Sequence, residues 1–224
     1  ERISPSMKNI ILIAPPAAGK GTQSSLIEEK YNLPHISTGD ILRDISKEDS
    51  EIGRYILETL SSGGLVKDEI IYELIEKRLK QDDCKNGCIL DGFPRNLEQA
   101  KKYDEILSRL NQKLDYVLVL DIDSKILEKR ITGRRICSNC GAVYNINTEA
   151  QKPKEESICD NCGGRLEQRN DDNVESFQNR YKVYEEKTAP LLDYYKQNGV
   201  LYVINGVGSV QEVFERIDKV LKGR

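Results

Sequence analysis

The stretch from Ile10 to Thr22 joins an apolar run to residue types that bind phosphate. It reads Ile-Ile-Leu-Ile-Ala-Pro-Pro-Ala-Ala-Gly-Lys-Gly-Thr. Residues 10–13 suit a strand that is covered on both faces, and a helix is expected to begin near Lys20. At such a helix N-terminus the backbone N–H groups face a phosphate, Lys20 reaches the outer phosphates and Thr22 offers a hydroxyl towards Mg2+. The stretch predicts a nucleotide-binding loop, and the alternative is a strand–turn–helix joint with an exposed lysine.

A second apolar strand ends in a carboxylate. Cys88-Ile89-Leu90-Asp91 is followed by Gly92-Phe93-Pro94-Arg95. Mg2+ and its water shell take hard oxygen ligands, so Asp91 is a candidate for the metal side of a phosphate site. The alternative role for Asp91 is to cap the helix that follows.

Four cysteines form two Cys-x-x-Cys pairs, which are separated by the spacing of a zinc ribbon. Gly141 and Gly163 follow the two pairs and allow tight turns. Four thiolates fill a tetrahedral site, so the expected zinc is structural rather than catalytic. The predicted ligands are Cys137, Cys140, Cys159 and Cys162. We interpret the other two cysteines as a near-surface thiol, Cys84, and a core thiol, Cys88.

Arginines flank the four-cysteine insert on both sides. They are Arg130, Arg134 and Arg135 before it, and Arg169 and Arg180 after it. Guanidinium groups in this number around one insertion suggest phosphate clamps, although surface charge is the plainer alternative.

The composition limits the classes of function. The chain has 224 residues, of which 38% are hydrophobic and 32% are charged, with a net charge of −3. This charge gives no reason to expect nucleic-acid binding, and no apolar run approaches the ~20 residues of a membrane span. No secretory signal is apparent, so the cysteines indicate metal or free thiols rather than disulfides. The only methionine is Met7, and we interpret residues 1–6 as a vector-derived remnant.

Apolar strands alternate with amphipathic helices along the whole chain, which predicts an α/β fold with a mostly parallel sheet. His35, the only histidine, is interpreted as a packed or capping residue rather than a ligand. Thr38 is the candidate cap of the second helix, and Ser209 with Glu212 predicts a capping box for the last one. The expected strands cover 10–13, 35–37, 88–91, 116–122 and 200–204. The expected helices cover 20–29, 51–60, 68–81, 96–109, 124–131 and 173–197, with further helices beginning at 38 and after 209.

Taken together, these motifs resemble the adenylate kinase family from Lys8 to the C-terminus. The matching motifs are Gly19-Lys20-Gly21-Thr22-Gln23, Ser37-Thr38-Gly39-Asp40, Leu90-Asp91-Gly92-Phe93-Pro94-Arg95, Gly133-Arg134-Arg135 and Arg169-Asn170-Asp171-Asp172. The four-cysteine insert is similar to the zinc-bearing lid of the long bacterial-type form. The resemblance implies a P-loop kinase with a five-stranded parallel sheet, which catalyses ATP + AMP = 2 ADP with Mg2+ and maintains adenine nucleotide balance.

The resemblance also implies a division of the chain and of its site. The core covers 7–36, 67–132 and 173–224, the AMP-binding segment 37–66 and the zinc lid 133–172. The catalytic residues implied are Lys20, Asp91, Arg95, Arg134, Arg169 and Arg180. Those implied for ATP are Ala17, Ala18, Gly19, Lys20, Gly21, Thr22, Arg130, Arg134, Val143, Tyr144 and Gly208. Those implied for AMP are Thr38, Arg43, Gly64, Leu65, Val66, Gly92, Phe93, Pro94, Arg95, Gln99, Arg169 and Arg180, with Gln99 at the adenine edge. A cytoplasmic monomer without nucleic-acid or membrane partners is expected.

The chain departs from the family pattern at two places. Ala14 and Ala17 stand where the phosphate loop usually has glycine, and Gly208 stands where many relatives carry lysine. Because the rest of the site is complete, we expect both alanines to have ordinary, negative φ values. Three alternatives stay open: a zinc-ribbon nucleic-acid-binding NTPase, a kinase for another nucleoside monophosphate, and GTP as the donor.

Overall fold

The structure, a computed structural model, describes residues 7–223, so the interpretation of residues 1–6 as a remnant lies outside the described part. The chain divides into two compact units. Within the described residues, the first unit comprises 7–13, 19–120 and 187–223, and the second comprises 14–18 and 121–186. Each unit has a hydrophobic cluster of its own.

The first unit is built on a five-stranded sheet in the order β2-β3-β1-β4-β8. Its strands are β1 (Lys8–Ile13), β2 (His35–Ser37), β3 (Gly87–Asp91), β4 (Tyr116–Asp121) and β8 (Leu201–Asn205). β1 pairs in parallel with β3 and β4, and β2 pairs in parallel with β3. The predicted α/β fold with a five-stranded parallel sheet is confirmed. Parallel strands end at one edge of a sheet, so Ser37 and Asp91 meet where β1 leads into the phosphate loop.

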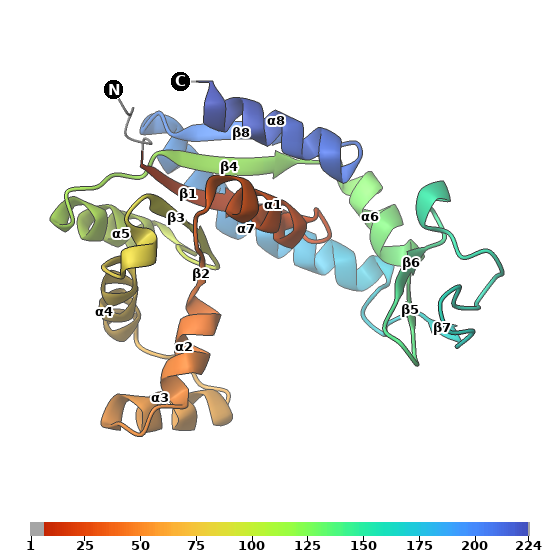
Figure 1. The fold of residues 1–224 in the computed structure, drawn as a ribbon, viewed down its shortest axis with the longest axis horizontal. Helices are drawn as coiled ribbons and strands as arrows, with labels where there is room; N and C mark the ends of the chain where they lie inside the picture. The colour runs from red at the N-terminus through yellow and green to blue at the C-terminus, as the bar shows by residue number, and fades with distance from the viewer. Residues whose placement is uncertain (1–6, 224) are drawn as a thin grey trace. The chain divides into compact units, whose positions relative to one another are not determined.

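Within the described residues, seven helices belong to this unit wholly or in part. They are α1 (Lys20–Tyr31), α2 (Thr38–Ser46), α3 (Glu51–Ser61), α4 (Asp68–Leu79), α5 (Leu97–Arg109), the C-terminal part of α7 (Val174–Gln197) and α8 (Val210–Lys222). Of these, α4, α5 and α7 supply the buried helical residues of its core cluster. In Figure 1, α2 and α3 form a pair beyond the end of β2. The predicted Ser209–Glu212 capping box at the start of α8 is confirmed.

Two local predictions were wrong. The cap of α2 is Ser37, whose Oγ accepts a hydrogen bond from the Asp40 amide at 3.4 Å, whereas Thr38 is the first helical residue. Cys84 is not near the surface, because its residue is only 2% exposed. α4 ends at Leu79, and a short 3₁₀ turn, η1 (Asp82–Cys84), then folds the Cys84 thiol inward. Burial raises the pKa of Cys84 to about 11 and that of the core thiol Cys88 to about 12.

The second unit contains a small antiparallel sheet in the order β6-β5-β7. Its elements are α6 (Ser124–Gly133), β5 (Arg134–Cys137), β6 (Val143–Asn145), η2 (Glu149–Gln151), β7 (Leu166–Glu167) and the N-terminal part of α7. The buried cluster at this sheet consists of only Cys137, Cys159 and Leu166. Within residues 7–223, no helix combines the length and the apolar character that crossing a membrane requires.

Candidate functional site

The phosphate loop turns sharply before α1 begins. Gly19 precedes the helix in the left-handed region, with φ of +82° and ψ of 26°, and no atom lies within 4 Å of the place that a Cβ would occupy. A side chain at this position would be strained and would stand in open space beside the first N–H groups of α1. Gly19 therefore gives a phosphate close access to these donors.

The two alanines of the loop differ in conformation. Ala17 has a φ of +65°, whereas Ala14 is not among the residues with positive φ. The prediction of an ordinary φ is therefore confirmed for Ala14 and wrong for Ala17. A left-handed alanine costs about 1–2 kcal/mol, because its Cβ approaches the following carbonyl oxygen. Two features of the turn hold Ala17 in this region. On its C-terminal side the Ala18 amide donates a hydrogen bond to the Pro15 carbonyl at 3.3 Å, and Gly19 then caps α1.

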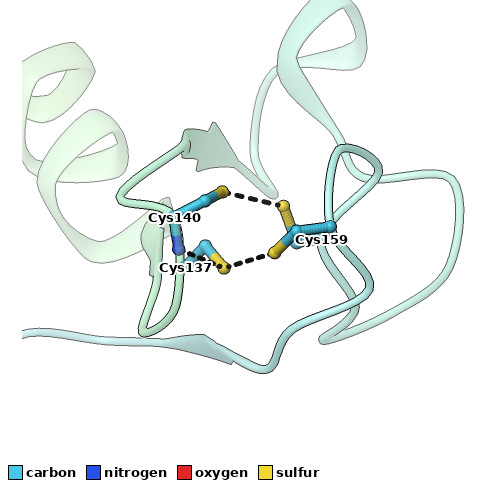
Figure 2. Close-up of side chains that lie close together, drawn as sticks. Cys137, Cys140 and Cys159 are labelled. Atoms are coloured by element: carbon cyan, nitrogen blue, oxygen red, sulfur yellow. Dashed lines mark hydrogen bonds between the residues drawn. The ribbon is translucent and has the colours of Figure 1, made fainter.

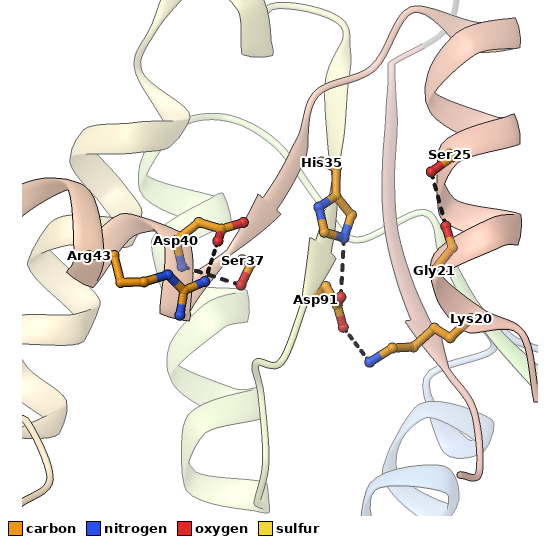
Figure 3. Close-up of polar contacts among 8 residues, drawn as sticks. All are labelled: Lys20, Gly21, Ser25, His35, Ser37, Asp40, Arg43 and Asp91. Carbon is orange, nitrogen blue, oxygen red and sulfur yellow. Dashed lines mark hydrogen bonds and ion pairs between the residues drawn. The ribbon is translucent and has the colours of Figure 1, made fainter. Parts of the chain in front are cut away.

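Lys20, Asp91 and His35 form a connected polar group at the edge where the strands end. The Lys20 ammonium lies 2.5 Å from Asp91 Oδ1, and His35 Nε2 lies 3.1 Å from Asp91 Oδ2 (Figure 3). The three side chains come from α1, β3 and β2. The sequence motifs placed Lys20 and Asp91 in one site, and the structure brings them into direct contact. His35 was interpreted as a packed or capping residue, and its contact with Asp91 shows a polar role that its sequence position did not reveal.

The electrostatics of this group favour an ionised carboxylate. Burial by itself raises the pKa of Asp91, but the hydrogen bond and charge of Lys20, together with His35, outweigh burial and lower it. Asp91 therefore presents anionic oxygen atoms beside the lysine of the phosphate loop. Such atoms suit a hydrated Mg2+ that accompanies a nucleotide.

Arg95 and Thr38 lie around Gly92, just beyond the end of β3. A Cβ built on Gly92 lies 3.6 Å from Thr38 Oγ1 and 3.9 Å from Arg95 Nη2. Arg95 Nε donates to the Gly92 carbonyl at 2.9 Å, which leaves the Nη atoms for other acceptors. Phe93 is buried between Tyr72 and Tyr103 and anchors this segment in the core.

Gln99, the candidate for reading the adenine edge, is held by three contacts. Its Oε1 accepts from the Arg95 amide at 2.7 Å, its Nε2 donates to Asp68 Oδ1 at 3.3 Å, and its own amide donates to Asn96 Oδ1 at 2.9 Å. A primary amide has two N–H donors, so one donor of Nε2 is left for a ligand. The side chain is thus fixed before any ligand binds.

The remaining candidates of the AMP-binding segment lie on and after α2 and α3. Arg43 forms an ion pair with Asp40 on the first turns of α2. In the Gly64–Val66 segment the side chain of Val66 is buried, whereas Leu65 is 93% exposed. An exposed leucine beside a glycine pair is a surface on which a flat base can pack.

In the second unit, Arg134 and Asp172 form a bidentate ion pair. Arg134 Nε lies 2.8 Å from Asp172 Oδ2 and Nη2 lies 2.6 Å from Oδ1, and the Asp172 side chain is fully buried. A guanidinium has five N–H donors, so three of those on Arg134 are left for a phosphate. The ion pair therefore orients the Arg134 guanidinium without using all of its hydrogen-bond donors.

Three other arginines of this unit are less constrained. Within residues 7–223, no ion pair involves Arg130, Arg169 or Arg180. Arg169 and Arg180 are exposed. Their positive charges are therefore open to an anionic ligand.

The four cysteines of the insert meet in one cluster. All four Sγ atoms lie within 4.8 Å of one another, and the pairs Cys137–Cys162 and Cys140–Cys159 are 3.4 and 3.6 Å apart. Figure 2 shows three of the thiols pointing into one space. A Zn–S distance of about 2.3 Å implies sulfur atoms roughly 3.8 Å apart in a tetrahedron. The donor set and its spacing fit a four-thiolate metal centre.

Backbone geometry around the cluster supports this fit. Gly141 and Gly163 have φ of +76° and +74°, which confirms the tight turns expected after each cysteine pair. The amides of Cys140 and Gly164 point at Cys137 Sγ and Cys162 Sγ, each at 3.4 Å. A Cβ on Gly164 would lie 3.0 Å from Cys137 Sγ, so this glycine is required by the cluster, a role that its sequence position did not reveal.

Val143 and Tyr144, the predicted neighbours of the ATP adenine, differ in their surroundings. Val143 is 64% exposed, whereas Tyr144 packs against the cysteine cluster. Tyr144 Oη accepts from the Asp160 amide at 2.9 Å and lies 3.4 Å from Cys159 Sγ. The contact with the Tyr144 hydroxyl, together with hydrogen bonds from the backbone of Asn161 and Cys162, lowers the pKa of Cys159 to about 6.

Comparisons with known proteins identify one family. The adenylate kinase family model matches residues 12–200. The chain is 46% identical to an adenylate kinase of Fervidobacterium nodosum over 96% of this chain and 98% of the relative. It is 45% identical to an adenylate kinase of Archaeoglobus fulgidus, with coverage of 96% and 98%. It is 47% identical to an adenylate kinase of Bacillus cytotoxicus, with coverage of 96% and 99%.

Proposed function

The chain belongs to the adenylate kinase family, and from this premise we propose how its residues carry out the reversible transfer ATP + AMP = 2 ADP. It is a phosphotransferase of the nucleoside monophosphate kinase class. The observation that carries the proposal is the 2.5 Å contact between Lys20, at the phosphate loop, and Asp91, at the end of β3. That contact supports the proposal, because Lys20 would bind phosphate directly beside the carboxylate that would take part in metal binding.

Phosphoryl transfer depends on positioning and charge neutralisation more than on covalent catalysis. The acceptor is itself a phosphate oxygen, so no general base is needed. Mg2+ bound with ATP would neutralise the phosphate charge, and the ionised Asp91 would hold its water shell. Lys20 and the N–H groups at the start of α1 would bind the donor phosphates, and Thr22 would offer its hydroxyl to the metal.

The AMP side is assigned to segment 37–66 and to the residues that follow β3. Arg95 has free Nη atoms beside Gly92, and Gln99 has one free N–H donor, so we propose that they bind the AMP phosphate and the adenine edge. Leu65 and Val66 would border the base. Thr38 and Arg43 would complete the site. To do so, Arg43 would leave its ion pair with Asp40 and bind the phosphate of the nucleotide instead.

The phosphate-binding arginines of the second unit are assigned to residues 133–172 and α7. Arg134, oriented by Asp172, and Arg130 would act on the ATP phosphates, and Arg169 and Arg180 on phosphates of both nucleotides. Val143 would border the ATP base. Enclosure by this segment would exclude water, which would otherwise accept the phosphoryl group. The core of the kinase is assigned to 7–36, 67–132 and 173–224.

We propose that the four-cysteine cluster holds a structural Zn2+, because four thiolates leave no open coordination position. Metal content of the purified protein tests this by atomic absorption. Cys159→Ala should lose the metal and unfold at a lower temperature, whereas Cys84→Ala, which removes a buried cysteine elsewhere, should retain it. Unchanged metal content in Cys159→Ala would exclude this residue as a ligand.

Substrate preference is tested with a nucleotide panel in a coupled ADP-forming assay. We expect AMP to be the preferred acceptor over GMP, CMP and UMP, and ATP the preferred donor over GTP. Lys20→Met should lose nearly all activity, whereas Lys80→Met, an exposed lysine at the end of α4, should be unaffected. Preference for another monophosphate would change the substrate assignment while leaving the reaction class.

We also propose that the protein is a monomer that acts in the cytoplasm, because one chain carries a complete set of motifs and its substrates are nucleotides of central metabolism. Light scattering of the purified protein tests the oligomeric state. A filter-binding assay with single-stranded DNA tests the rival nucleic-acid function, for which no retention is expected.

A further inference from the structure

The turn between β8 and α8 has an unusual backbone. It runs from Asn205 to Ser209, and Gly208 has a φ of +123°. A Cβ at Gly208 would lie 3.2 Å from Glu212 Oε2 and 3.5 Å from Arg216 Nη2. A side chain at this position would therefore be strained by the backbone conformation and would press against the ends of two side chains on α8.

Arg216 of α8 holds this turn through two backbone carbonyl groups. Its Nη1 donates to the Asn205 carbonyl at 2.7 Å and to the Val207 carbonyl at 2.5 Å. Its Nη2 lies 3.9 Å from Glu212 Oε2, and Glu212 in turn accepts from the Ser209 amide at 3.3 Å. One guanidinium thus fixes the start and the middle of the turn and, through Glu212, its end.

The far end of the turn is attached to the helix that follows the phosphate loop. Gln23 Nε2 on α1 donates to the Val210 carbonyl at 3.1 Å, and Gln23 is only 3% exposed. Lys20 lies on the same helix, one turn earlier. The 205–210 backbone therefore has a fixed position relative to the residue that binds the donor phosphates.

We propose that Arg216 is a positioning residue for the donor nucleotide, because it sets the shape of the 205–208 turn, which contains Gly208, one of the residues implied for ATP. The inference rests on the proposed function and on Gly208, which the resemblance to adenylate kinases implies for ATP. It also explains why glycine at 208 is compatible with function here. A lysine at 208 would have a strained backbone, and the positive charge beside the turn comes instead from Arg216 of α8.

The test separates donor from acceptor binding. Arg216→Ala removes two charge-assisted hydrogen bonds, and we expect KM for ATP to rise roughly tenfold. KM for AMP and kcat should stay within about twofold, because AMP is assigned to segment 37–66 and to the residues that follow β3. Arg216→Lys keeps the charge but not the planar fork, so it should give an intermediate KM for ATP. Lys219→Ala, which removes an exposed positive charge from the same helix, should behave as the wild type.

Calorimetric titration with ATP in the absence of AMP provides a second readout. In Arg216→Ala the affinity for ATP measured in this way should fall in parallel with the rise in KM for ATP. Equal increases in KM for ATP and AMP, or an unchanged affinity for ATP, would overturn the proposal. If Arg216→Ala does not fold, Arg216→Gln takes its place, because glutamine retains N–H donors without the charge. A wild-type protein that binds ATP but does not phosphorylate AMP would contradict the proposed function alone, and the calorimetric comparison would still decide the role of Arg216.

Discussion

At the scale of single residues, Ala17 shows that a turn can hold a left-handed backbone without glycine. Left-handed φ values normally select glycine, and the chain adopts one at Ala17 with φ of +65°. In the proposed function, the nearby Gly19, Lys20 and Thr22 would supply the access and the polar groups that phosphate binding needs. The alanine therefore affects the stability of the loop more directly than its chemistry.

Replacement of this alanine by glycine should stabilise the protein. Ala17→Gly removes a strain of about 1–2 kcal/mol from the folded state. It also increases the conformational entropy of the unfolded chain, which lowers the stability by roughly 0.4–1 kcal/mol. We expect a net gain of roughly 0.5–1 kcal/mol in the free energy of unfolding, measured by denaturant titration. Ala14→Gly is the matched control and should lose stability, because Ala14 lacks a positive φ. A loss at both positions would show that the loop is not strained at Ala17.

At the scale of elements, an ionic cluster joins α1 to α8 and should make stability depend on pH. Asp218 of α8 binds Lys30 at 2.6 Å, Lys222 at 3.0 Å and the Tyr31 hydroxyl at 2.5 Å. Burial raises the pKa of Asp218, but these hydrogen bonds outweigh burial and lower it to about 2.

A carboxyl group whose pKa is lower in the folded state stabilises the fold above its unfolded pKa of about 3.9, and this contribution is lost as the pH falls towards the folded value. Asp218→Asn should therefore lower the urea midpoint at pH 6 to 7, and the difference from wild type should shrink as the pH falls from 4 towards 2. Asp49→Asn, which removes a fully exposed partner of Arg54, should show no such difference. A pH-independent effect of Asp218→Asn would indicate lost packing instead of lost charge.

The strand β6 should act on the metal centre through one hydroxyl group. The Tyr144 hydroxyl lies 3.4 Å from Cys159 Sγ, and hydrogen bonds to metal ligands typically change metal affinity by 10–100-fold. Tyr144→Phe should therefore lose zinc about tenfold more readily in competition with a chromophoric chelator. Val143→Ala, on the exposed neighbour in the same strand, should not. Equal zinc affinity in Tyr144→Phe and wild type would show that the contact does not support the site.

The elements also show what the sequence can and cannot predict. The C-terminal ends of β1, β2 and β3, the cysteine cluster and the Ser209–Glu212 box follow from local patterns, and the structure confirms them. Cys84 was misplaced because its burial depends on how η1 folds back under α4, which a local pattern does not encode. The contact of His35 with Asp91 could not be predicted for the same reason, because it joins residues of two strands that lie 56 positions apart in the sequence.

At the scale of the whole molecule, catalysis should depend on arginines that add little to folding. Arg169 is exposed and takes part in no ion pair among residues 7–223. Arg169→Ala should leave the thermal unfolding midpoint unchanged and reduce kcat/KM by the equivalent of roughly 2–5 kcal/mol, the cost of removing one partner from a buried charge pair. Arg54→Ala, which removes an exposed arginine from α3, is the control and should remain active. Wild-type turnover of Arg169→Ala would remove Arg169 from the site.

The two units should respond differently when the metal is removed. The first unit has an extensive apolar core, whereas the buried cluster at the β6-β5-β7 sheet consists of two cysteines and Leu166. A segment with so little apolar burial depends on metal binding for its folding free energy. A strong chelator should therefore increase hydrogen exchange in residues 134–167 and leave the amides of β1, β3 and β4 protected. The rate of phosphoryl transfer should fall as residues 134–167 lose their order. Added zinc should restore both the order of this segment and the rate. If exchange rises equally in β1, β3 and β4, the metal stabilises the whole molecule rather than this segment.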